Sequence, residues 1–257
     1  MNRPRLLLIE DDASIRRFVT LALEDQPLEL VEAPSLAAAV QALRGAPFDV
    51  VMCDLMLPDG SGMDLLRELT EPDAPSAGAC RVAFSAGVSA SVRQQLQQIG
   101  VHRVLGKPVS LADLSACVAG ALAQAMSASA AASEPAAPGA GAKEAVTSAG
   151  RTRTSSAQQA AIEEFFGGDR TLYRSFYQQC VQQFAHDLAA GERALAHGDL
   201  AALRRLAHSL KSVLLTLGHG SDSACAARLE TCAAQGRADA SAALWQSLAQ
   251  RLRDLAA

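Results

Sequence analysis

Apolar positions follow two different patterns along the chain. In the first half, short apolar runs typical of buried strands alternate with segments whose apolar residues recur at helical spacing. The expected strands are Arg5–Ile9, Leu28–Val31, Phe48–Cys53, Arg81–Phe84 and Val101–Leu105. The expected helices are Ser14–Leu23, Leu36–Leu43, Met63–Leu69, Val88–Ile99 and Leu111–Leu122. This alternation predicts a parallel sheet covered by helices on both faces, with function at the carboxyl ends of the strands.

The second half shows helical spacing only. The expected helices are Gln158–Phe166, Leu172–His197, Leu200–Leu217, Ser223–Gln235 and Ala242–Leu255. Glycine-containing breaks separate them, and at one break Gly198 suits the residue after a helix while Asp199 suits an N-cap. The pattern predicts an all-α antiparallel helical bundle.

Between the two halves the composition changes. Ala, Ser, Gly, Pro and Thr dominate residues 127–156, and large apolar side chains almost disappear. Such a segment cannot bury enough surface to offset its ordering entropy, so we expect a flexible linker. The 257 residues therefore divide into an α/β domain over 1–126, a linker over 127–156 and a helical bundle over 157–257.

Charge and composition exclude several classes of protein. The net charge of −4 provides no basic footprint for nucleic acid, and no apolar run is long enough to span a bilayer or to form a signal peptide. The six cysteines show no CxxC spacing and are expected to be reduced thiols. We therefore expect a cytoplasmic protein that neither binds nucleic acid nor inserts into membranes.

Polar side chains follow four of the predicted strands, where the carboxyl ends of parallel strands share one edge of the sheet. They are Glu10, Asp11 and Asp12 after the first strand, Asp54 after the third, Ser85 after the fourth and Lys107 after the fifth. Clustered carboxylates suit Mg²⁺, which prefers oxygen ligands. A carboxylate that attacks phosphorus forms an acyl phosphate, while a hydroxyl and a lysine can hold the remaining phosphoryl oxygens.

These residues occur in segments that resemble the receiver domain of response regulators. The segments are IEDDASIRR, FDVVMCDLMLPDGSGMDLL, AFSAG and LGKP, within about Pro4 to Gln124. The resemblance implies a flavodoxin-like domain with a five-stranded parallel sheet. It also implies these roles: Asp54 as phosphoacceptor, Glu10, Asp11, Asp54 and the Met56 carbonyl as Mg²⁺ ligands, Ser85 as switch hydroxyl, and Lys107 as phosphate-binding lysine.

Two positions qualify the resemblance. Asp12 is a possible substitute in the acidic pair, although the family's pair directly follows the apolar strand, which here ends at Ile9. Val104 stands where the family often has an aromatic residue coupled to the switch hydroxyl, so the chain departs from the family pattern at this position.

His208 is distinguished from the other histidines of the bundle by its neighbours. Leu203, Leu206, Leu210, Val213, Leu214 and Leu217 form the apolar stripe of its helix. Arg204, Arg205, Lys211 and Ser212 lie one turn before and after it, so we expect His208 to face solvent. An exposed neutral imidazole is a competent nucleophile.

The segment AHSLKSVLLTLG, with FFGGDRTLYRSF before it and CAARLE after it, resembles the histidine phosphotransfer (Hpt) domain over about Gln158 to Ala257. The resemblance implies His208 as phosphoacceptor, Lys211 as its charge partner and Gly218 as the small residue of the following turn. The family usually has glycine where this chain has Ser212. Serine is nearly as small, so we expect the function to survive, with altered docking of a partner.

The two resemblances together predict a phosphorelay signalling protein, with no enzymatic activity beyond its own phosphorylation and His–Asp transfer. The expected partners are a sensor or hybrid histidine kinase and the receiver domain of a downstream response regulator. The chain has no glycine-rich nucleotide loop, so its phosphate comes from outside. Asp54 and His208 could exchange phosphate directly across the linker or serve different partners, with flow in either direction.

Three other functions fit parts of the sequence. A transcriptional response regulator would carry a helix-turn-helix DNA-binding domain with a basic recognition helix in the second half. A hydrolase with Asp54 as nucleophile would need a second aspartate two residues on, where this chain has Met56. The bundle could also be a docking module with an inert His208.

Overall fold

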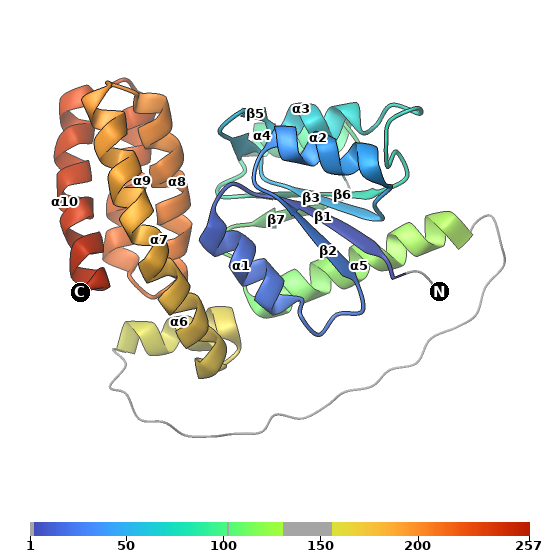
Figure 1. Cartoon of the computed structure of the whole chain (residues 1–257), viewed down its shortest axis with the longest axis horizontal. Coiled ribbons are helices and arrows are strands. Elements are labelled where there is room, and N and C mark those ends of the chain that lie inside the picture. The colour runs from blue at the N-terminus through green and yellow to red at the C-terminus, as the bar shows by residue number, and fades with distance from the viewer. Residues whose placement is uncertain (1–2, 102, 131–155) are drawn as a thin grey trace.

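The structure is a computed structural model that describes residues 3–101, 103–130 and 156–257. It consists of an α/β domain and a helical bundle that lie side by side (Figure 1). The predicted linker over 127–156 lies almost entirely outside the described residues. Its first residues continue helix α5 as far as Ala130, so this helix is longer than the predicted Leu111–Leu122.

A five-stranded parallel sheet forms the centre of the α/β domain, as the alternating pattern predicted. Its strands are β1 (Arg5–Ile9), β2 (Glu29–Ala33), β3 (Val50–Cys53), β6 (Cys80–Ser85) and β7 (Arg103–Gly106). They are arranged in the order β2-β1-β3-β6-β7, and the register places Ile9 beside both Ala33 and Cys53. This is the order of the flavodoxin-like sheet, whose functional site lies at the carboxyl edge.

The pattern did not predict a small antiparallel ribbon of two strands. β4 (Met56–Leu57) and β5 (Gly60–Ser61) pair directly after β3, where Leu57 lies opposite Gly60. Two-residue strands are too short to produce a detectable alternation of apolar and polar residues. The ribbon closes the LPDG turn and places Ser61 as the N-cap of the following helix.

Five helices cover the two faces of the sheet. They are α1 (Ala13–Ala22), α2 (Leu36–Gly45), α3 (Gly62–Glu68), α4 (Ala90–Gln98) and α5 (Leu111–Ala130). Alternate residues of β1 point to opposite faces: Leu6 and Leu8 pack with α1 and α5, while Leu7 and Ile9 pack with α2, α3 and α4. Because both faces are buried, the strands contain continuous apolar runs.

The second part of the chain is helical throughout its described residues. After α6 (Ser156–Phe166), four longer helices follow: α7 (Arg170–Ala196), α8 (Leu200–Thr216), α9 (Gly220–Ala234) and α10 (Ala238–Ala256). α7 packs on α8 and α10, and α9 packs on the same two helices, which closes a four-helix bundle. As predicted, Asp199 caps α8, accepting a hydrogen bond from the Ala202 N–H at 2.8 Å.

Helices α7 and α10 pack closely against each other at Gly191. A Cβ atom added at Gly191 of α7 would lie 2.0 Å from Cζ2 of Trp245 in α10, which is 2 % exposed. Gly191 is therefore required because the indole ring occupies the space of a side chain. None of the described helices has the length and apolar character needed to cross a membrane.

The two domains share a continuous apolar contact. Helix α1 of the α/β domain packs against α7, and α6 contacts α5, α7 and α8. At the centre of this contact the Phe18 ring lies 5.6 Å from Phe166 and 5.5 Å from Phe176, in edge-to-face orientation. Edge-to-face aromatic pairs at this separation are favourable, so the contact is a packed interface.

Candidate functional site

Three carboxylates converge at the carboxyl edge of the sheet. One oxygen each of Glu10, Asp11 and Asp54 lies within 4.8 Å of the other two. Glu10 follows β1 and Asp54 follows β3, which are neighbouring strands. The expected convergence at the strand ends is therefore observed. The all-oxygen donor set suits a hard divalent cation such as Mg²⁺.

Lys107 lies among these carboxylates. Its Nζ is 2.6 Å from Oδ2 of Asp54 and also donates a hydrogen bond to Glu10. Burial lowers the pKa of Lys107, but the charges of Glu10 and Asp54 outweigh burial and raise the pKa above its ordinary value. Lys107 is therefore a permanent cation beside Asp54.

The carboxylates still carry more negative charge than the lysine offsets. Burial raises the pKa of Glu10 well above its ordinary value, and the charge of Asp54 raises it further. Burial and the charge of Asp54 also raise the pKa of Asp11, to about 6. Raised carboxyl pKa values mark a place that favours additional positive charge, as a cation site does.

Asp12 has a different role from the two acids before it. It is the N-cap of α1, and its carboxylate accepts hydrogen bonds from the backbone N–H groups of Ser14 at 2.8 Å and Ile15 at 3.1 Å. The cluster of three carboxylates contains Glu10 and Asp11 but not Asp12. This arrangement favours Glu10 and Asp11 as the acidic pair.

Arg16 supports the backbone that carries the acidic pair. Its guanidinium donates hydrogen bonds to the carbonyl oxygens of Glu10 at 2.7 Å and Asp11 at 2.8 Å. The sequence interpretation did not identify this residue as part of the site. A guanidinium on a helix turn next to the loop is only identified as a clamp once the loop's path is known.

Asp54 is almost fully buried, at 2 % exposure. Its Oδ1 accepts a hydrogen bond from the Met56 N–H at 3.0 Å, and its Oδ2 contacts Lys107. The backbone of Asp54 lies so close to Gly62 that a Cβ there would be 1.8 Å from the Asp54 carbonyl oxygen. Ser85, also buried, ends β6, and its carbonyl accepts a hydrogen bond from the Lys107 N–H at 3.1 Å.

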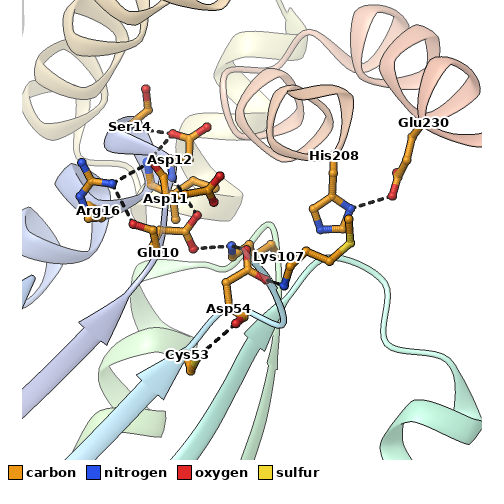
Figure 2. A network of polar contacts seen from close by, with 12 residues as sticks. Glu10, Asp11, Asp12, Ser14, Arg16, Cys53, Asp54, Lys107, His208 and Glu230 are labelled. Atoms are coloured by element: carbon orange, nitrogen blue, oxygen red, sulfur yellow. Dashed lines mark hydrogen bonds and ion pairs between the residues drawn. The ribbon is translucent and has the colours of Figure 1, made fainter. Parts of the chain in front are cut away.

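His208 projects from α8 toward the edge of the sheet that carries Asp54 and Lys107 (Figure 2). The expectation that it faces solvent is wrong, because its exposed fraction is 5 %. The helical pattern correctly predicted which residues neighbour His208 along the helix. However, the face of α8 that carries His208 is turned toward the α/β domain and not toward solvent.

Glu230 of α9 binds the other side of the histidine ring. Its Oε1 lies 2.7 Å from Nδ1 of His208, and its Oε2 is 2.6 Å from Nζ of Lys211. Burial raises the pKa of Glu230, but the hydrogen bonds from His208 and Lys211 outweigh burial and lower it to about 2. The carboxylate is therefore ionised and can only accept, so Nδ1 of His208 carries a proton.

The Nε2 atom of His208 is buried and has no hydrogen-bond partner among the described residues. In the neutral imidazole with a proton on Nδ1, Nε2 carries the lone pair. The ring therefore presents an unoccupied nucleophilic nitrogen on the side that faces the α/β domain (Figure 2). Lys211 contacts Glu230 and adds positive charge near the ring.

The contact of His208 with Glu230 was not predicted from sequence. Only its resemblance to a family motif singled out the CAARLE segment, which ends at Glu230, and 22 residues separate the partners. Spacing along the sequence does not show which residues of two antiparallel helices are in contact, so the motif was the only sequence feature that pointed to Glu230.

The two domains also meet beside the turn of α8 that precedes His208. A groove between them is lined by Met56 and Leu57 of the ribbon and by Arg204 and Arg205 of α8. These four residues flank the two phosphoacceptor candidates. The edge of the sheet that carries Asp54 therefore faces the part of the bundle that carries His208.

Comparison with known proteins gives two family matches. The response regulator receiver domain family matches residues 6–119, and the Hpt domain family matches residues 175–257. Fold, site and matches together define a phosphotransfer signalling protein.

The relatives include the response regulator receiver protein CpdR of Brucella abortus, 32% identical over 111 residues, which are 43% of this chain and 89% of CpdR. The response regulator PilR of Pseudomonas aeruginosa is 31% identical over 122 residues, 48% of this chain but only 27% of PilR. Among solved structures, a CheY-like receiver domain protein of Methanospirillum hungatei is 21% identical, with a TM-score of 0.46, and the match covers 49% of this chain and 98% of that one.

The chain belongs to the response regulators of two-component systems, as a fusion of a receiver domain with an Hpt domain. The Hpt match over 175–257 gives no support to the alternative of a DNA-binding domain in this half. The fold classes expected for the two domains are confirmed.

Proposed function

We propose that this protein is a phosphorelay intermediate in which Asp54 and His208 of one chain exchange a phosphoryl group directly. The observation that carries the proposal is the buried Nε2 of His208, which no described residue binds and which faces the strand edge holding Asp54. The packed interface between the domains turns the face of the bundle that carries His208 toward the edge of the sheet that carries Asp54, so the exchange needs no second copy of the chain.

The chemistry follows from the groups at the site. A carboxylate oxygen of Asp54 attacks the phosphorus of a phosphodonor and forms an acyl phosphate as the donor group leaves. The lone pair on Nε2 of His208 then attacks the same phosphorus. The bond from phosphorus to the Asp54 oxygen breaks, and its electron pair returns to the carboxylate. The reverse sequence uses the same atoms.

Each neighbouring residue has a defined part in this exchange. Lys107 offsets the charge of the phosphoryl group on Asp54. The Ser85 hydroxyl, at the end of the neighbouring strand, binds a phosphoryl oxygen. Glu230 holds the proton on Nδ1 and stabilises the positive charge that develops on the ring when Nε2 bonds to phosphorus. Lys211 keeps Glu230 in place and adds positive charge.

The cluster of Glu10, Asp11 and Asp54 fits Mg²⁺, and the Met56 carbonyl is the fourth proposed ligand. When bound, the metal supplies charge that screens the incoming phosphoryl oxygens from the carboxylates. Glu10 and Asp11 would coordinate the metal, and Asp12 and Arg16 hold the backbone of the loop that carries them. Lys107 then contacts the phosphoryl group.

The outside partners in this proposal are a sensor or hybrid histidine kinase and the receiver domain of another response regulator. Asp54 and His208 are 2 % and 5 % exposed, so neither partner reaches its target while the domains are closed together. The protein therefore exchanges phosphate internally when closed and with partners when open. We place it in the cytoplasm, because the phosphate of such a relay originates from ATP.

The test uses acetyl phosphate with Mg²⁺ and follows phosphate that is stable in base, the signature of phosphohistidine. We expect such label on His208 in the wild type and none in Asp54→Asn or in His208→Ala. A mixture of these two variants distinguishes exchange within a chain from exchange between chains. At low concentration the mixture should stay unlabelled on His208, and the wild-type rate should not depend on concentration.

Label confined to Asp54 in the wild type would contradict the proposal and favour a bundle that serves only outside partners or is inert.

A further inference from the structure

A second polar atom near His208 is buried without a partner. The hydroxyl oxygen of Ser212 has no hydrogen-bond partner among the described residues, and Ser212 is 3 % exposed. Buried polar side-chain atoms in folded proteins nearly always have a partner. Ser212 follows His208 by four residues in α8, so the two side chains are neighbours on one face of the helix.

Ser212 lies at the contact between the two domains. It lines a cavity of about 20 Å³ whose wall also includes Lys107 and Phe84 of the receiver and Thr216 of α8. The Thr216 hydroxyl is already used, because it donates to the Ser212 carbonyl at 2.9 Å. Lys107 contacts Asp54. Ser212 therefore offers a hydrogen-bond donor that has no partner among the described residues, on the side of α8 that faces the receiver.

We propose that Ser212 is a phosphoryl-binding residue, whose hydroxyl donates a hydrogen bond to a non-bridging oxygen of the phosphoryl group on His208. The inference rests on the proposed function, since it assigns a further contact to the same phosphoryl group. That one group would provide the missing partner of both buried atoms: Nε2 of His208 by a covalent bond and Oγ of Ser212 by a hydrogen bond.

The chemistry of the two groups is complementary. A phosphoryl group presents three strong acceptor oxygens, and a serine hydroxyl is a donor with a freely rotating proton. The proton stays on the serine oxygen throughout, and the bonds that form and break at phosphorus are those of the exchange with Asp54. Glycine, which the resembled family usually has at this position, offers no such donor.

The first test measures the single-turnover rate of transfer from phosphorylated Asp54 to His208. We expect Ser212→Ala and Ser212→Gly each to slow the transfer by about tenfold, the effect typical of losing a hydrogen bond to a charged group. The control is Ser209→Ala, a serine of the same helix next to His208 but on another face, and its rate should stay within about twofold of the wild type.

Wild-type rates in both Ser212 variants would overturn the inference. So would a slow alanine variant with a fast glycine variant, because the methyl group and not the lost hydroxyl would then be responsible.

The second test does not depend on exchange between the domains. In the Asp54→Ala background, His208 is phosphorylated with phosphoramidate, and the phosphohistidine is titrated by ³¹P NMR. A hydrogen bond from Ser212 favours the more charged phosphoryl form, so we expect Ser212→Ala to raise the pKa of the phosphoryl group. An unchanged titration would overturn the inference even where wild-type transfer succeeds. Absent transfer with a shifted titration would instead contradict only the proposed function.

Discussion

Glu230 determines which nitrogen of His208 can react: its Oε1 lies 2.7 Å from Nδ1, and Nε2 on the other side of the ring has no partner within the described parts of the chain. The two residues come from different helices, α8 and α9. The packing of these helices therefore selects both the tautomer of the ring and the direction of its nucleophile.

The contact predicts the effect of neutralising Glu230. Glu230→Gln removes the negative charge that stabilises the ring cation and leaves Lys211 without its ion pair. We expect transfer from Asp54 to His208 to slow by roughly tenfold, while phosphorylation of Asp54 by acetyl phosphate is unchanged. Glu192→Gln is the matched control, because Glu192 forms an exposed ion pair with Arg253 elsewhere in the bundle. A wild-type transfer rate in Glu230→Gln would show that the ring needs no charge partner.

The aromatic contact between the domains predicts how they open. Phe18→Ala removes both edge-to-face pairs, with Phe166 and Phe176, each worth roughly 0.5–1.5 kcal/mol. We expect the radius of gyration in solution scattering to increase and the internal transfer rate to fall. Transfer from phosphorylated His208 to an added receiver should accelerate, because the histidine becomes accessible.

The control for this change is Phe48→Ala, which removes a buried ring from the opposite face of the sheet. It should lower the stability of the receiver without opening the domains. An increased radius in both variants would attribute the opening to a weakened receiver and not to the aromatic contact.

Substitution of Gly62 is expected to reduce phosphorylation of Asp54 without changing any of the reacting groups. In Gly62→Ala the new methyl would lie 1.8 Å from the Asp54 carbonyl oxygen, so the backbone that carries the phosphoacceptor must shift. We expect labelling of Asp54 by acetyl phosphate to fall by at least about tenfold, as small misplacements at reacting centres do. Gly78→Ala is the control, since a Cβ there meets nothing within 4 Å. Equal labelling of the two variants would disprove the close approach.

The burial of Asp187 in α7 predicts that the stability of the protein depends on pH. Burial, together with the charge of Asp12 in the receiver, raises its pKa from 3.8 to about 7. The folded state therefore binds the proton more tightly than the unfolded state, so the stability contribution is present below about pH 4 and is lost as pH rises to about 7.

Asp187→Asn removes this titration. We expect the variant to be more stable than the wild type in urea at pH 8, on the order of 2 kcal/mol, and the difference to disappear near pH 4. Asp239→Asn changes an exposed aspartate of α10 and should show no such dependence. A gain that is equal at both pH values would mean that ionisation of Asp187 is not its cause.

The sequence by itself determined most of the receiver. Apolar runs that alternate with helical segments require a parallel sheet, and parallel strands bring their carboxyl ends to one edge. Residues that directly follow those strands, such as Asp54 and Lys107, were therefore predictable as neighbours. The helices of the bundle followed from their spacing and glycine breaks in the same way, with ends displaced by a few residues, because terminal turns depend on capping contacts.

Only the tertiary structure decided what surrounds His208. A helical pattern states which residues share a face, but it does not state what covers that face, so His208 was expected in solvent and is buried. Glu230, Phe18 and Ser212 acquire their importance from contacts between helices and between domains that are distant in sequence. Such contacts arise from packing of surfaces whose relative placement no local periodicity encodes, and here they place a nucleophilic nitrogen against the edge of the sheet that carries Asp54.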